Sequence, residues 1–255
     1  MGQLNYKKIE EKLVKWIRNH VVDASCSGAI VGLSGGIDSA VTAVLCKKAF
    51  NNDTLGVIMP CYSNKQDEND ARLLADKFDI NYVTRDLNTA YDEFIDILKP
   101  GNKDLSDNIS EEKAKMARAN IKPRLRMITL YYYAACHNYL VVGTDNWSEL
   151  TIGYFTKYGD GGVDLAPLGR LVKTEVRELA QHLEIPEKII NKKPSAGLWE
   201  GQTDEEEMGF SYKELDQYIL TGEVDDTIQE KIKRLIKKND HKTKPIPKPE
   251  RDILV

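Results

Sequence analysis

The sequence predicts an α/β fold in which helices cover both faces of a parallel sheet, with a helical extension at the C-terminus. Two observations carry this prediction. Short apolar runs rich in β-branched residues lie at 29–33, 54–60, 81–87 and 139–144. Segments with apolar residues at helical spacing separate these runs, and such alternation of strands and helices is typical of parallel βαβ units.

The helices of the first half follow from the spacing of apolar residues. The first segment, from Leu4 to Val21, has a clear helical period. Further helices are expected at 40–50, in the segment that ends near Phe78, at 91–98 and at 117–136.

The second half contains fewer apolar runs and two irregular stretches. The segment 173–186 predicts an amphipathic helix that Pro186 ends, and Thr203 with Glu206 predicts a capping box for a later helix. The tail from His241 onward is rich in Pro and Lys, so we expect it to be extended. We expect the loops 99–110 and 151–164 to be poorly ordered without substrates.

Composition excludes several classes of protein. The 255 residues include 36 basic and 40 acidic side chains, a balance that argues against disorder and against bulk binding of nucleic acid. No signal-peptide core and no apolar run of about 20 residues is present, which argues against a membrane protein. The four cysteines are scattered, as in a reduced, cytoplasmic protein.

The loop 32–39, with the sequence GLSGGIDS, is the most informative segment. It lies between a predicted strand and a predicted helix, where glycines and free N–H groups suit phosphate. It has neither the G-K-[ST] ending of a Walker A loop nor the G-x-G-x-x-G pattern. A glycine-rich turn that serves only folding is the alternative interpretation.

Asp38 favours the phosphate-binding interpretation of this loop. A carboxylate beside a phosphate repels it by roughly 4 kcal/mol at about 4 Å and an effective dielectric constant of about 20. A bridging cation removes that conflict, and oxygen ligands with a polyphosphate are typical of Mg²⁺. Asp38 is therefore the first predicted metal ligand.

This loop resembles the pyrophosphatase loop of ATP-dependent adenylating enzymes, a superfamily that includes NAD synthetases, GMP synthetases, argininosuccinate synthetases and tRNA-modifying enzymes. Further segments resemble the ammonia-dependent NAD synthetase family in particular; they lie at 120–127, 143–177, 193–205 and 241–242. The resemblance runs from about Asn5 to Lys242. It implies a Rossmann-like sheet and one synthetase domain over residues 1–255, without a glutaminase domain.

The resemblance also implies a reaction. Family members adenylate the nicotinate carboxylate of deamido-NAD with ATP, release pyrophosphate, and form NAD and AMP when ammonia attacks the acyl adenylate. It implies Mg²⁺ as cofactor, free ammonia as nitrogen donor and a homodimer. No covalent nucleophile is expected, and the four histidines show no spacing suited to a triad or a metal cluster.

The residues that match the family's motifs fall into three groups. By resemblance, ATP is bound by Gly32, Leu33, Ser34, Gly35, Gly36, Ile37, Asp38, Ser39, Thr144, Lys173 and Ser195. By resemblance, deamido-NAD is bound by Arg124, Lys157, Asp164, His241 and Lys242. The Mg²⁺ ligands implied are Asp38 and Glu149.

Two other functions are compatible with the loop. One is another adenylating ligase, although a tRNA thiolase usually shows paired cysteines or a basic surface. The other is a nucleotide-binding sensor without turnover. The presence of Asp38, Glu149 and Lys173 together favours a catalyst over a sensor.

Overall fold

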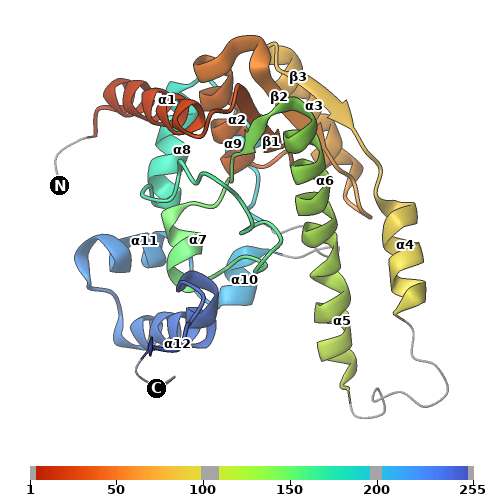
Figure 1. Ribbon diagram of the computed structural model, residues 1–255. Helices are drawn as coiled ribbons and strands as arrows, with labels where there is room; N and C mark the ends of the chain where they lie inside the picture. Colours follow the sequence, from red (N-terminus) through yellow and green to blue (C-terminus); the bar gives the residue numbers. More distant parts are fainter. Residues whose placement is uncertain (1–3, 99–108, 196–202, 252–255) are drawn as a thin grey trace.

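A sheet of four parallel strands forms the centre of the computed structural model, which describes residues 4–98, 109–195 and 203–251 (Figure 1). The strand order is β3-β2-β1-β4. The strands are β1 (Gly28–Gly32), β2 (Thr54–Ile58), β3 (Asn81–Thr84) and β4 (Tyr139–Val141). Every pairing is parallel, with Ile30 opposite Leu55 on one side and Val141 on the other. The predicted α/β class is confirmed.

Helices connect the strands and extend the chain beyond them. Those of the first half are α1 (Tyr6–Asp23), α2 (Ile37–Phe50), the 3-10 turn η1 (Asn51–Asp53), α3 (Lys65–Lys77), α4 (Asn88–Ile97), α5 (Glu111–Ala119) and α6 (Ile121–His137). Those of the second half are α7 (Trp147–Ile152), α8 (Lys173–His182), α9 (Glu187–Ile190), α10 (Asp204–Met208), α11 (Tyr212–Thr221) and α12 (Asp226–Thr243). Among the described helices, none is both long and apolar enough to cross a membrane.

Both faces of the sheet are buried, which explains the uninterrupted apolar run of β1. Ala29 and Val31 belong to a core with α1, α2, α3 and α8. Ile30 points the other way, into a core with Leu130 and Ala134 of α6. Alternate residues of a strand face opposite sides, so a strand covered on both sides is apolar at every position.

The C-terminal helices form the predicted extension with a smaller core of its own. Ile152, Met208, Leu215 and Ile232 bring α7, α10, α11 and α12 together. Figure 1 shows these four helices grouped below the sheet, with α12 close to α7. The extension therefore packs on the helix that follows β4.

The predicted helix at 117–136 is in fact two helices. The α5 helix ends at Ala119, and α6 begins at Ile121 after Asn120. Pro123 explains the break, because proline has no N–H to donate to the carbonyl of Ala119 and is tolerated only in the first turn of a helix.

Two further expectations about the second half need correction. The α12 helix continues through His241 and Lys242 to Thr243, so the tail leaves the helix only at Lys244, which is extended as expected for the residue before Pro245. Residues 245–250 form neither helix nor strand. Thr203 precedes α10 as its N-cap, but its side chain makes no capping hydrogen bond. The predicted capping box of Thr203 with Glu206 therefore does not form.

Candidate active site

The strand order creates a crevice between the carboxyl ends of β1 and β4. The chain passes from β1 to β2 on one side, whereas β4 lies on the other side of β1. Ligands of open α/β sheets bind at such a switch point, outside the carboxyl ends of the strands. The loop 32–39 follows β1, and Thr144 and Glu149 follow β4, so the sheet brings these segments together.

The loop 32–39 has a fixed conformation that leaves N–H groups available. Gly35 has φ +76°, and a Cβ at this position would lie 2.2 Å from the carbonyl oxygen of Asp67. Ser34 Oγ donates to Ser39 Oγ at 3.0 Å, and Ser39 Oγ donates to the carbonyl of Gly36 at 3.0 Å. The first N–H groups of α2 have no acceptor within the helix, which suits an anion.

Lys173 lies between the two carboxylates that the sequence assigns to a metal. Its Nζ is 2.6 Å from Asp38 Oδ2 and 3.0 Å from Glu149 Oε1. The Lys173 side chain is only 5% exposed, and Lys173 is the first residue of α8. Lys173 is therefore not a surface lysine, and Glu149, whose side chain is 12% exposed, is not a solvated helix charge.

Burial and charge shift the pKa values of this cluster. Burial by itself lowers the pKa of the Lys173 ammonium, but Asp38 and Glu149 outweigh it and raise that pKa above its ordinary value. Burial raises the pKa of Glu149 to about 7, against the lowering effect of Lys173. Lys173 is therefore a fixed positive charge at neutral pH.

Asn146 connects the two carboxylates, and the sequence analysis missed it. Its Nδ2 donates to Asp38 Oδ1 at 2.9 Å. Its Oδ1 accepts from the backbone N–H of Glu149, whose Oε2 in turn accepts from the backbone N–H of Asn146, both at 3.1 Å. The sequence signal was available, because N-x-x-E before a helix predicts this reciprocal capping.

The donor set fits a hard divalent cation. Asp38 and Glu149 both reach the ammonium of Lys173, so their oxygens converge on one point that already favours positive charge. Within the described ranges, no group of three or more His, Cys, Asp or Glu side chains could hold a metal alone. Two carboxylates with phosphate oxygens as further ligands are the usual arrangement for Mg²⁺.

The structure brings together four of the five residues expected to bind the dinucleotide. Arg124 Nη2 donates to the carbonyl of Lys157 at 3.3 Å, and Lys157 Nζ donates to the carbonyl of His241 at 2.6 Å. Lys242 Nζ donates to the carbonyls of Gly153 and Phe155, both at 2.8 Å. The C-terminal end of α12 thus holds the segment 151–164.

Asp164, Thr144 and Ser195 have different surroundings. Asp164 accepts from the Tyr131 hydroxyl at 2.9 Å and from the backbone N–H of Val141 at 2.8 Å, so it fixes the end of β4. Thr144 is partly exposed just beyond β4, and Ser195 is exposed beside the undescribed stretch 196–202. Their roles in binding stay predictions.

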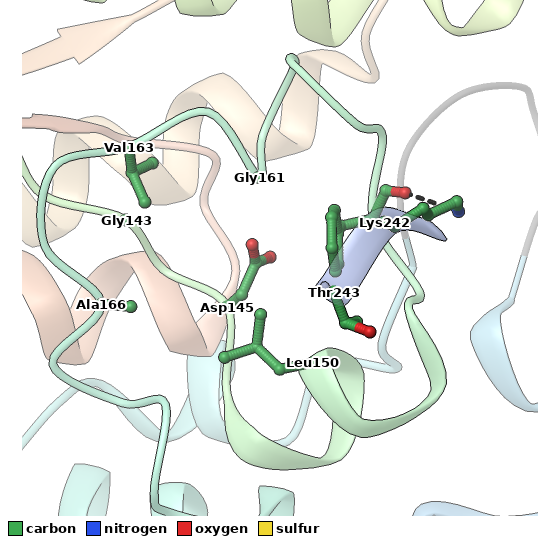
Figure 2. A pocket seen from close by; sticks show the side chains of 9 residues that line it. Gly143, Asp145, Leu150, Gly161, Val163, Ala166, Lys242 and Thr243 are labelled. Carbon is green, nitrogen blue, oxygen red and sulfur yellow. Dashed lines mark hydrogen bonds between the residues drawn. The ribbon is translucent and has the colours of Figure 1, made fainter. Parts of the chain in front are cut away.

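A pocket of about 320 Å³ opens beside the cluster (Figure 2). It lies at the end of β4 and is lined by Gly143, Asp145, Leu150, Phe155, Gly161, Val163, Ala166, Lys242 and Thr243.

Figure 2 shows Asp145 pointing into this pocket. Asp145 is 8% exposed, and its carboxylate accepts no hydrogen bond from the part of the chain that is described. Burial, followed by repulsion from Asp160, Glu149 and Asp38, raises the pKa of Asp145 well above its ordinary range.

Comparisons with known proteins agree on one family. The NAD synthase family model matches residues 9–246. An NH(3)-dependent NAD(+) synthetase of Carboxydothermus hydrogenoformans is 54% identical over 240 residues, which cover 94% of this chain and 96% of that protein. The solved NMN synthetase from Francisella tularensis is 37% identical, with a TM-score of 0.89 and coverage of 97% of this chain and 99% of that chain. The solved NH3-dependent NAD synthetase from Campylobacter jejuni is 32% identical, with a TM-score of 0.78 and coverage of 97% and 100%.

We expect Asp145→Asn to stabilise the fold at neutral pH. Because the folded-state pKa of Asp145 is raised, the native state binds this proton more tightly than the unfolded state. The wild type therefore loses stability as the pH rises above the unfolded pKa of about 3.9. The amide removes that cost, so the free energy of unfolding at pH 7 should rise by about 1–2 kcal/mol.

Urea denaturation at pH 7 and at pH 4.5 measures this effect, with a smaller difference between variant and wild type at pH 4.5. Asp76→Asn, on the exposed side of α3, is the matched control and should change stability by less than about 0.5 kcal/mol. A destabilising Asp145→Asn at pH 7 would show that the carboxylate is needed for the fold.

Proposed function

This chain belongs to the NAD synthase family, and we propose that it is an ammonia-dependent ligase that converts deamido-NAD into NAD. ATP transfers AMP to the nicotinate carboxylate, and pyrophosphate leaves. Ammonia then attacks the acyl carbon, a C–N bond forms, and AMP departs with the electrons of the C–O bond. The observation that carries this proposal is the cluster of Asp38, Lys173 and Glu149 at the carboxyl ends of β1 and β4.

The residues of the site would act by positioning groups and neutralising charge. Negative charge builds on the leaving pyrophosphate, and preorganised donors stabilise such charge most where water is excluded. The loop 32–39 offers the N–H groups of the α2 start, and Lys173 offers a buried ammonium. No step of the reaction requires a covalent protein nucleophile.

Asp38 and Glu149 would hold the Mg²⁺ that accompanies ATP. The ion supplies compensation for the negative charge of the triphosphate. Asn146 orients both carboxylates through its side chain and its N–H, so their positions are set before any ligand arrives.

The nitrogen donor and the compartment are also proposals. The family match extends over residues 9–246 and the Carboxydothermus relative is covered to 96%, which supports a single synthetase domain that takes free ammonia. All four cysteines are free thiols, which supports a reducing compartment such as the cytoplasm.

A second candidate is the same amidation on the mononucleotide, with nicotinic acid mononucleotide as substrate. The similarity to the NMN synthetase from Francisella tularensis, at a TM-score of 0.89, favours testing it. The cluster of Asp38, Lys173 and Glu149 would serve deamido-NAD and the mononucleotide equally, because the reacting carboxylate is the same.

An end-point assay with ATP, Mg²⁺ and ammonium tests the function. With deamido-NAD we expect NAD, AMP and pyrophosphate in equal amounts, and a faster reaction than with the mononucleotide. Asp38→Asn should reduce turnover by about 10²-fold or more, because the metal loses a charged ligand, whereas Asp76→Asn should leave it unchanged.

Three outcomes would change the proposal. Faster formation of NMN than of NAD would establish the second candidate. Nucleotide binding without AMP release would favour a sensor, and full turnover by Asp38→Asn would exclude this residue as a metal ligand.

We further infer a homodimer that forms across α6. Ile128 and Tyr132 lie four residues apart on this helix and are 60% and 64% exposed, so they form an apolar stripe on one face. Sedimentation velocity should give about twice the chain mass of 28.9 kDa.

Tyr132→Glu should give a monomer, because it would bury a charge in the interface. Val22→Glu is the control, since Val22 is equally exposed but lies on α1. A wild-type monomer at micromolar concentration would contradict the inference.

A further inference from the structure

One face of α11 contacts the starts of α7 and α8, which carry Glu149 and Lys173, two of the three charged residues of the cluster. Tyr212 and Asp216 are four residues apart, so they lie on the same face of the helix. They are 4% and 2% exposed, which is unusual for side chains that end in a hydroxyl and a carboxylate. Neither residue belongs to the predicted binding sets.

Asp216 fixes the backbone around Lys173. Its Oδ1 accepts from the Ser148 hydroxyl at 2.5 Å, and its Oδ2 accepts from the N–H of Thr174 at 2.8 Å. The same Ser148 hydroxyl oxygen accepts from the N–H of Lys173 at 3.0 Å. A single carboxylate therefore ties the residue before Glu149 to the start of α8.

Tyr212 reaches the functional side chains themselves. Its hydroxyl oxygen lies 3.2 Å from Glu149 Oε1 and 2.9 Å from Asp204 Oδ2. Its ring lies under the ammonium of Lys173, whose Nζ is 4.8 Å from the ring centroid. Tyr212 thus contacts both the anion and the cation of the cluster.

The hydroxyl has one proton and two carboxylate acceptors, so it donates to one of them at a time. When Glu149 Oε1 coordinates a cation, the hydroxyl can donate to Asp204 instead. No buried polar group then loses its hydrogen bond, and the cost of leaving a buried donor unpaired, about 1–3 kcal/mol, is avoided.

We propose that Tyr212 is a positioning residue for the cation and nucleotide site, whose hydroxyl moves from Glu149 to Asp204 when Glu149 takes a metal ligand role. This proposal deepens the proposed function and rests on Glu149 being a metal ligand. Asp216 completes the support from the same helix face, because it accepts from the Ser148 hydroxyl, which holds the N–H of Lys173, and from the N–H of Thr174.

Binding of Mn²⁺ tests the proposal without turnover. The full chain is titrated with Mn²⁺ in the presence of α,β-methylene-ATP, and free Mn²⁺ is followed by electron paramagnetic resonance. We expect Tyr212→Phe to weaken Mn²⁺ binding roughly five- to tenfold, because the variant loses the hydroxyl that orients Glu149 and that pairs with Asp204 when Glu149 is engaged elsewhere. In the amidation assay, the same variant should raise the KM for ATP more than it lowers kcat.

Tyr218→Phe is the matched control, since it makes the same substitution on the same helix. The described residues give the Tyr218 hydroxyl no hydrogen bond, so Mn²⁺ affinity should stay at the wild-type value. A thermal melt of each variant confirms that it is folded.

Asp204→Asn adds a test of coupling. In the wild-type background it should weaken Mn²⁺ binding about two- to threefold, because the hydroxyl has a poorer alternative acceptor. In the Tyr212→Phe background it should have no further effect, and additive losses would overturn the exchange of the hydroxyl between the two carboxylates.

The outcomes separate this proposal from the proposed function. Equal Mn²⁺ affinity of wild type and Tyr212→Phe would overturn only the role of Tyr212. Failure of the wild type to bind Mn²⁺ with the nucleotide analogue would overturn the metal-site assignment and, with it, both proposals.

Discussion

The ammonium of Lys173 between Asp38 and Glu149 is the interaction on which the rest of the site depends. Three buried charges close together are costly unless each has partners with good geometry. Asn146 supplies donors to both carboxylates, and Tyr212 supplies a hydroxyl and a ring. The sheet order, the capping of α7 and the packing of α11 can each be understood as a means of assembling these partners.

The same constraint explains why the C-terminal extension packs where it does. The core that α11 shares with α7 and α12 is apolar, but its edge toward α8 carries Tyr212 and Asp216. Apolar packing therefore sets the distance of α11 from α7 and α12. Tyr212 and Asp216 set the orientation of the starts of α7 and α8. A charge cluster built from three helix starts gains rigidity in this way, and such preorganisation lowers the reorganisation that a reaction needs.

The sequence predicted the parts of this site whose signal is local. The loop 32–39 is recognisable from its own glycines and Asp38, and the strands from their apolar runs. Glu149 and Lys173 were predicted only through the resemblance, because the N-x-x-E pattern marks Glu149 only as a capping residue and nothing near Lys173 distinguishes it from a surface charge. Tyr212 was missed because Glu149 and Lys173, which it contacts, lie far away in the chain. The break at Asn120 was missed because helical periodicity continues across it.

The surroundings of Asp145, beside the cluster, bear on whether ammonia or water attacks the acyl adenylate. An acyl adenylate hydrolyses if water reaches it, so the site has to limit water while a small nucleophile enters. The pocket beside β4 has Leu150, Phe155 and Val163 in its walls and contains one buried carboxylate. Apolar walls disfavour bulk water and strengthen electrostatic interactions inside. Burial raises the pKa of Asp145, and burial likewise raises the pKa of Glu149. One packing arrangement at the end of β4 thus buries both the carboxylate of the pocket and that of the charge cluster.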